Sequence, residues 1–112
     1  MKWSDLVNDT CPVARTMSLI GDRWTILIIR DCFLGRSRFE EFQKSTGMTR
    51  HVLSSRLKRL TENDILQKRT AKSGRSQHEY VLTEKGRELG PALAILRDWG
   101  KAHMPVRRAA RV

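Results

Sequence analysis

The sequence predicts a mainly α-helical fold with a small β-hairpin in its C-terminal half. Apolar residues recur at helical spacing as far as about residue 62, and the period then changes to two between residues 65 and 82. Helical spacing returns after Thr83. Helices followed by a hairpin with a basic turn are typical of a winged helix-turn-helix. At 112 residues we expect one such domain over residues 1–105 and a basic tail over residues 106–112.

Proline, glycine and a dense apolar run mark the first two helices. Pro12 suits the first position of a helix, which places Cys11 at the N-cap, and Gly21 is expected to end this helix. Residues 24–34 form an apolar segment, and its β-branched residues leave a strand as the alternative to a helix. Its length and its central charged pair favour a largely buried helix, which Gly35 would end.

The next two helices have the spacing of a helix-turn-helix. Ser37 is followed three residues later by Glu40, which predicts a capping box for a short helix that ends near Gly47. Thr49 is the next N-cap candidate, for a helix that runs to about Asn63. Residues 46–48 would then be the short turn between the two helices.

Alternating residues predict two strands, at 65–72 and 78–82, on either side of turn residues at 73–76. Together they would form the wing. Thr83 is expected to cap a final helix, and Gly90 with Pro91 should kink or restart that helix.

Positive charge is concentrated in three segments of the chain. The net charge is +10, and residues 49–59, 67–78 and 101–112 each carry +4 without a single acid, so the remaining residues sum to −2. Segregated charge of this kind is typical of a protein that binds nucleic acid. The alternative is that lysine and arginine only keep the surface soluble, but that explains three acid-free blocks poorly.

The predicted helix at 49–63 has one apolar and one polar face. Leu53, Leu57 and Leu60 fall on one side and should face the core. The opposite side is polar and basic, as in a recognition helix that enters the major groove, although a polar face can also simply meet water. Arg56 lies beside the leucines, so we expect its head to pair with an acid.

The wing is expected to contribute two further contacts to DNA. Arg75 at its tip suits insertion into a minor groove, or is a solvated turn residue, and Lys72 suits the phosphate backbone. With the helix residues, the expected double-stranded DNA contacts are Thr49, Arg50, His51, Ser54, Ser55, Lys58, Arg59, Lys72 and Arg75.

The two ends of the chain carry apolar stripes that exceed what a small winged domain can cover alone. We therefore predict a homodimer, with two recognition helices separated by roughly 34 Å or a multiple of it. The expected dimerisation residues are Trp3, Leu6, Leu89, Leu93, Leu96 and Trp99.

The two cysteines have different surroundings in the sequence. Cys32 lies in the apolar helix and should be a buried, inert thiol. Cys11 is expected at a helix N-terminus, where the helix dipole favours a thiolate. Two interpretations of Cys11 stay open, a redox sensor and a cap or packing residue.

Several function classes are not supported by any pattern in the sequence. We find no nucleotide-binding loop, catalytic triad spacing or metal cluster, and the three histidines are scattered, so we expect no enzyme and no cofactor. The chain has neither a membrane-length apolar run nor a signal-peptide pattern, which predicts a cytoplasmic protein. The alternative to a sequence-specific regulator is a nonspecific nucleic-acid-coating protein, which should stack bases on exposed aromatics.

An ordered set of motifs over roughly residues 10–100 resembles the HxlR-type regulators. This resemblance implies a bacterial winged-helix transcription regulator related to the MarR group, which binds inverted-repeat operators as a homodimer. It also permits an N-terminal cysteine such as Cys11 to sense oxidants or electrophiles. One departure is Asp22-Arg23, where the family often has Gly-Lys. The matching stretches are CPV (11–13), IGDRWTILIIR (20–30), RFEEF (38–42), VLSSRLKRL (52–60), YVLTEKG (80–86) and WG (99–100).

Overall fold

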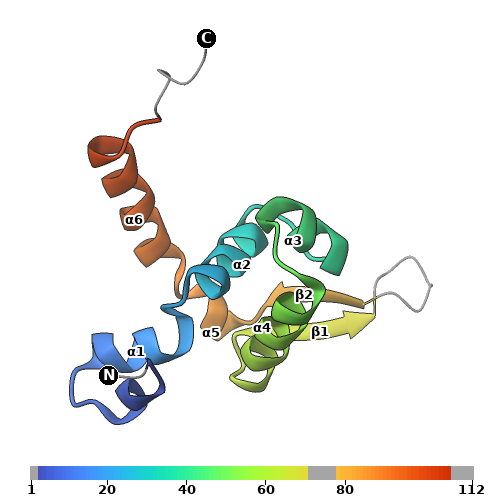
Figure 1. Cartoon of the computed structure of the whole chain (residues 1–112), viewed down its shortest axis with the longest axis horizontal. Helices are drawn as coiled ribbons and strands as arrows, with labels where there is room; N and C mark the ends of the chain where they lie inside the picture. Colours follow the sequence, from blue (N-terminus) through green and yellow to red (C-terminus); the bar gives the residue numbers. More distant parts are fainter. Residues whose placement is uncertain (1–2, 71–77, 107–112) are drawn as a thin grey trace.

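The computed structural model describes residues 3–70 and 78–106, which form a helical body with a two-stranded hairpin on one side and a projecting C-terminal helix (Figure 1). This arrangement confirms the predicted winged helix-turn-helix. The elements are a 3-10 helix η1 (Trp3–Asn8), helices α1 (Pro12–Ile20), α2 (Arg23–Phe33), α3 (Phe39–Thr46) and α4 (Arg50–Glu62), strands β1 (Leu66–Thr70) and β2 (His78–Leu82), and helices α5 (Glu84–Arg87) and α6 (Gly90–His103).

The core lies where α2, α3 and α4 meet the base of the hairpin. The apolar segment at 24–34 is a helix, as its length favoured, and Ile28 and Ile29 of α2 are fully buried. Phe42 from α3 belongs to the same buried cluster as these isoleucines and the leucines of α4, and it is also fully buried. Burying branched and aromatic side chains in one cluster is the main force that holds the three helices together.

Most of the predicted helix ends are confirmed. Cys11 is the N-cap of α1 and Pro12 its first residue, while Gly21 is its C-cap. The hydroxyl oxygen of Thr49 accepts a hydrogen bond from the Val52 N–H at the start of α4, and that of Thr83 accepts one from a backbone N–H in α5. A new helix then begins at Gly90, which confirms the predicted restart. Local cap chemistry thus determines where these helices begin.

The capping box before α3 lies one residue later than predicted. The N-cap is Arg38, and a Glu41 carboxylate oxygen accepts the N–H groups of Arg38 and Ser37 at 2.9 and 3.0 Å. The Ser37 hydroxyl, which was expected to cap the helix, donates instead to Glu79 in the wing. The pairing with Glu40 was therefore wrong, because a contact with a distant strand takes the hydroxyl that a local pattern had assigned to the cap.

The Glu41 contact predicts a pH-dependent gain in stability. The backbone N–H groups of Ser37 and Arg38 lower the pKa of Glu41 below its ordinary value of 4.5. The stabilisation is therefore complete above the unfolded pKa and is lost as the pH falls through the lower folded pKa. We expect Glu41→Ala to cost about 1 kcal/mol at pH 7 in urea unfolding, and progressively less as the pH falls below the ordinary glutamate pKa. Glu40→Ala is the control, and an equal loss in both variants would contradict this role.

A buried carboxylate fixes α3 against α2. Asp31 is fully buried, and its Oδ1 accepts hydrogen bonds from Arg30, Arg36 and Ser45 at 2.9 to 3.3 Å. Because a buried charge needs partners, these contacts constrain the end of α2, the following loop and the last turn of α3 together. Gly47 then turns the chain into α4 with φ 76°, a left-handed conformation that glycine adopts without strain.

The hairpin is tied to the helical body by backbone contacts. β1 and β2 are antiparallel, with Leu66 opposite Leu82 and Thr70 opposite His78. On its other side, β2 donates from the Tyr80 N–H to the Ser37 carbonyl at 2.7 Å. The middle of β2 is therefore held between β1 and the loop that leads into α3.

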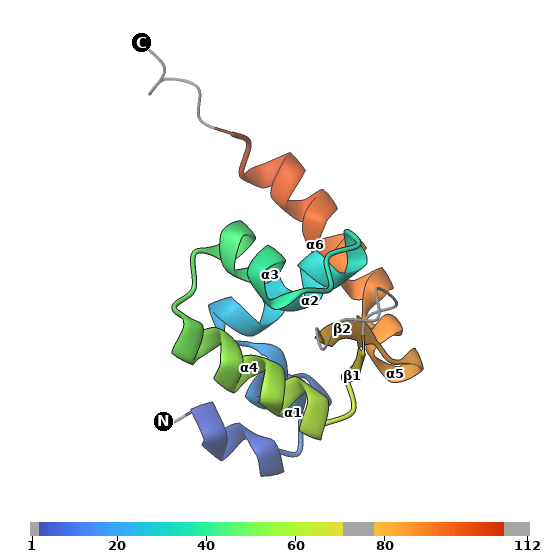
Figure 2. The ribbon, with the colours of Figure 1, turned by 90° about the vertical axis from the view of Figure 1, so that its right-hand side faces the viewer.

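α6 projects from the body on the side away from α4, as two perpendicular views show (Figures 1 and 2). None of its residues is buried within the chain. Among the described residues, no helix is long and apolar enough to cross a membrane.

Candidate nucleic-acid interface

α4 separates its apolar and polar residues as the sequence predicted. Leu53, Leu57 and Leu60 are buried against α2, α3 and the hairpin. Figure 2 shows α4 at the front of the body with no other element drawn over it, so its other side faces outward. Its exposed residues include His51, Ser54, Ser55 and Lys58. These side chains offer hydrogen-bond donors and acceptors and one cation on a face that no described element covers.

The first turn of α4 is held by Thr49 and Phe39. Thr49 caps the helix and is itself exposed. The Arg50 guanidinium lies over the Phe39 ring at 4.6 Å from its centroid, a cation–π geometry that orients the side chain while leaving it exposed. The structure therefore brings Thr49 and Arg50 to the same end of the outer face.

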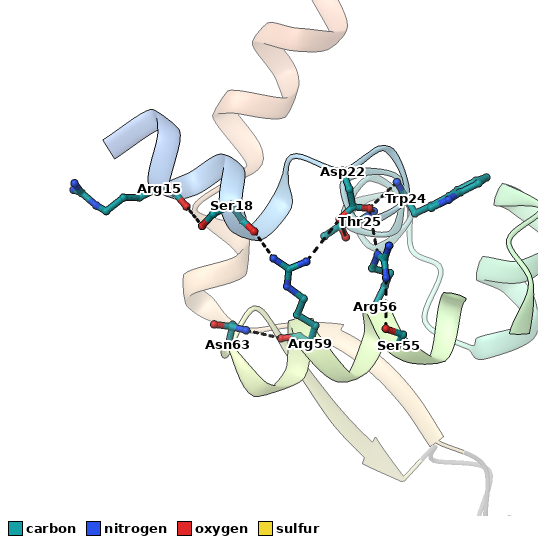
Figure 3. A network of polar contacts seen from close by, with 9 residues as sticks. All are labelled: Arg15, Ser18, Asp22, Trp24, Thr25, Ser55, Arg56, Arg59 and Asn63. Atoms are coloured by element: carbon teal, nitrogen blue, oxygen red, sulfur yellow. Dashed lines mark hydrogen bonds and ion pairs between the residues drawn. The ribbon is translucent and has the colours of Figure 1, made fainter. Parts of the chain in front are cut away.

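Two arginines of α4 turn away from this face (Figure 3). Arg56 Nε lies 3.4 Å from Oδ1 of Asp22, which confirms the expectation that Arg56 pairs with an acid. Arg59, which the sequence had suggested as a DNA contact, donates to the Ser18 carbonyl and lies 4.0 Å from Oδ2 of Asp22. The structure thus places Arg59 in a contact between α4 and α1.

Polar residues in the part of the hairpin nearer its turn link it to the helix-turn-helix. Glu79 accepts from Arg69 at 2.8 Å and from the Ser37 hydroxyl at 3.3 Å. The Lys68 ammonium lies 5.7 Å from the centroid of the Tyr80 ring. The sequence analysis missed Glu79, although an acid beside an acid-free block was a signal. Lys72 and Arg75 lie outside the described residues.

The residues predicted for dimerisation differ in how far the chain itself buries them. Leu89 and Leu93 are half-buried against the core, whereas Leu96 and Trp99 remain 59% and 56% exposed. An apolar groove of about 600 Å³ runs between α6 and α2. Leu6 in η1 is half-buried, and the Trp3 side chain lies outside the described part of the chain.

The two cysteines differ as expected in exposure. Cys11 is exposed at the start of α1. Cys32 is partly buried, and this burial, with the neighbouring Asp31 charge, raises the pKa of its thiol to about 12. The Cys32 thiol therefore stays protonated and unreactive near neutral pH. Within residues 3–70 and 78–106, no group of three histidine, cysteine or acidic side chains could hold a metal ion.

The family model for the HxlR-like helix-turn-helix matches residues 19–108. The chain belongs to the HxlR-like family. Members of this family are described as helix-turn-helix transcriptional regulators. The matched region includes α2 to α6 and therefore both the outer face of α4 and the wing.

Individual HxlR-like relatives agree with this placement. The chain is 41% identical over 93 residues to the uncharacterised HTH-type transcriptional regulator Rv3095 of Mycobacterium tuberculosis, covering 83% of this chain but 59% of that protein. It therefore spans about three-fifths of that relative's length. The crystal structure of PA1607, described as a candidate transcription factor, is 42% identical with a TM-score of 0.85, covering 96% of this chain and 75% of the other. The redox regulator HypR in its oxidised form is 30% identical with a TM-score of 0.76, covering 86% and 100%.

Proposed function

We propose that this protein is a homodimeric transcriptional regulator that reads operator DNA with the outer face of α4. The observation that carries the proposal is the exposed row of His51, Ser54, Ser55 and Lys58 on a helix whose opposite face is locked into the core. A rigid helix with short polar side chains can enter the major groove and meet base edges. Thr49 and Arg50 would meet the backbone at its first turn.

The wing would contribute the second set of contacts. Lys68 and Arg69 are exposed on β1, which continues toward the basic turn. We assign phosphate contact to Lys72 and minor-groove contact to Arg75 on the basis of sequence alone. Two copies joined through α6 and η1 would place two α4 helices, each with its wing, on the two half-sites of an inverted repeat.

Selection of bound duplexes from a random DNA pool tests this function directly. We expect the enriched sequences to share an inverted repeat with half-sites about one DNA turn apart, or a multiple of it. A nonspecific coating protein would bind the starting pool as well as the enriched one. Steep salt dependence is common to both functions, so sequence preference at fixed salt is the deciding measurement.

Replacing Lys58 should weaken recognition at one place in each half-site. Lys58→Ala removes a cation from the middle of the outer face, and we expect a loss of about 1–3 kcal/mol together with relaxed preference at one base pair. Lys101→Ala, which removes an exposed cation from α6, is the control for charge alone. Fluorescence anisotropy on single-base variants of the selected site gives both quantities. Equal losses on every sequence would assign Lys58 to phosphate instead.

The wing prediction is separate because it depends on groove shape. Arg75→Ala should weaken binding most where the flanking sequence is A·T-rich, since narrow minor grooves attract arginine. Operators with A·T-rich and G·C-rich flanks, compared at one salt concentration, measure the effect. A loss independent of the flanks would indicate a solvated or phosphate-contacting arginine.

Cys11 is proposed as the site at which an oxidant or electrophile releases DNA. It is exposed between η1 and α1, beside the expected dimer contacts, and the similar protein HypR is described as a redox regulator. A bulky group or a covalent link added to the Cys11 thiol would change the spacing of the two α4 helices in the dimer. We expect peroxide or a quinone to weaken operator binding by wild type and Cys32→Ser but not by Cys11→Ser. An identical response in all three would leave Cys11 as a cap residue.

A further inference from the structure

Asp22 holds a carboxylate in a fixed position between α1 and α2. It is the N-cap of α2, and its Oδ1 accepts the N–H groups of Trp24 and Thr25 at 3.0 and 2.9 Å. Its Oδ2 accepts the Thr25 hydroxyl at 2.5 Å, and Thr25 is fully buried. These hydrogen bonds, and the low exposure of the side chain (16%), hold the carboxylate in one position. A cation that pairs with Asp22 must therefore reach this position.

The cations that come to Asp22 are both from α4. Arg56 and Arg59 reach Oδ1 and Oδ2 at 3.4 and 4.0 Å, and Arg59 also donates to the Ser18 carbonyl at the end of α1 (Figure 3). Burial raises the pKa of Asp22, but hydrogen bonds from Thr25 and the charge of Arg56 outweigh it, so the net pKa is below its ordinary value of 3.8. The carboxylate is thus ionised at neutral pH and complements the two guanidinium groups.

This pairing changes how much charge α4 can offer to DNA. At 100° per residue, Arg59 projects about 40° from Ser55, at the margin of the outer face. A freed arginine at that margin has the length to reach a phosphate. Of the four cations in residues 49–59, Arg56 and Arg59 are paired at Asp22 and Arg50 lies over the Phe39 ring, whereas Lys58 is exposed on the outer face.

We propose that Asp22 determines specificity by withholding Arg59 from the phosphate backbone while, through Arg56, it fixes the angle of α4. The inference rests on the proposed DNA-reading function, and it assigns a role in specificity to a residue outside the outer face of α4. Nonspecific binding depends almost entirely on phosphate neutralisation, whereas specific binding also needs base contacts in register. A freed Arg59 would therefore raise nonspecific affinity, and a less constrained α4 would gain less binding free energy from base contacts on the correct site.

The test is a neutral substitution that preserves the helix cap. Asp22→Asn and Asp22→Ser both retain an oxygen for the N–H groups of Trp24 and Thr25. Binding is measured between 50 and 200 mM KCl on the selected operator and on a scrambled duplex of equal length. We expect the log–log salt slope on scrambled DNA to steepen by about 0.9, the effect of one additional phosphate contact from Arg59. We also expect the preference for the operator over scrambled DNA to fall by about 10-fold.

Second substitutions separate this role from simple destabilisation. Adding Arg59→Gln to Asp22→Asn should return the salt slope to that of the wild type. Arg56→Gln alone should leave the slope unchanged, because its guanidinium is already withheld. A structural role alone would lower the melting temperature and weaken binding to both duplexes without steepening the slope.

The outcomes distinguish this inference from the proposed function. If the wild type prefers its operator but the folded Asp22 variants keep the wild-type slope and preference, the inference is overturned while the function stands. If Arg56→Gln alone reduces the slope by about 0.9, Arg56 already contacts phosphate and the inference also fails. If the wild type shows no sequence preference, the proposed function itself fails.

Discussion

The double substitution Leu96→Glu/Trp99→Glu is expected to produce a folded monomer that binds the operator about 10²- to 10⁴-fold more weakly than the wild type. Both side chains are more than half exposed on α6, and the adjacent Ile95 is 69% exposed. Contiguous apolar surface of this kind indicates a protein contact, and two like charges would oppose it. Without the dimer, the second half-site loses the effective concentration that the first contact provides.

Sedimentation equilibrium at micromolar concentration measures the association, and anisotropy on full and half operators measures the binding. The half-operator affinity should be unchanged, because α6 lies away from α4. Lys101→Glu, a single charge change on the same helix, is the control. A wild-type chain that sediments as a monomer at this concentration would exclude the predicted dimer.

Phe42→Ala should be the most destabilising single substitution in the helix-turn-helix. Phe42 is fully buried at the centre of the core and is the buried residue through which α3 packs on α2 and α4. Truncating a buried phenylalanine costs about 3–5 kcal/mol, a large part of the stability of a small domain. Urea unfolding should show a lower midpoint at an unchanged slope, with DNA binding lost in proportion to the unfolded fraction.

Phe33→Ala is the matched control, because Phe33 is 40% exposed at the end of α2. Its loss should cost less than half as much in the monomer. Comparable losses for Phe33 and Phe42 would mean that Phe33 is covered in solution, as it would be if a second copy filled the groove between α2 and α6.

The sequence predicted best those features that short segments determine by themselves. Pro12, Gly47, Thr49 and Thr83 each mark a helix end, because a fixed φ, a left-handed turn or a capping hydroxyl acts within four residues. The spacing of the α4 leucines likewise predicted which face is buried and which is exposed. The same spacing predicted which residues form the exposed outer face of α4 in the candidate interface.

Features that depend on distant partners could not be predicted in this way. Arg59 has the charge and nearly the helical phase of a DNA contact, yet Ser18 and Asp22 lie close enough to engage it. Asp22 was noted only as a departure from the family pattern, whereas its carboxylate pairs with Arg56 and Arg59 of α4. Ser37 was assigned to a cap, whereas Glu79 takes its hydroxyl. Each case requires the three-dimensional approach of residues more than 30 positions apart.

The backbone contact between Tyr80 and Ser37 also affects the tendency of the protein to associate with its own copies at high concentration. A two-stranded sheet exposes two outer edges, and each unpaired edge invites a strand from another chain, which is how many β-hairpins begin to aggregate. Here the outer edge of β2 is engaged by the Ser37 carbonyl, and the outer edge of β1 carries Lys68 and Arg69. Like charges on two identical strands repel each other, so these side chains should disfavour edge-to-edge pairing between copies of the free protein.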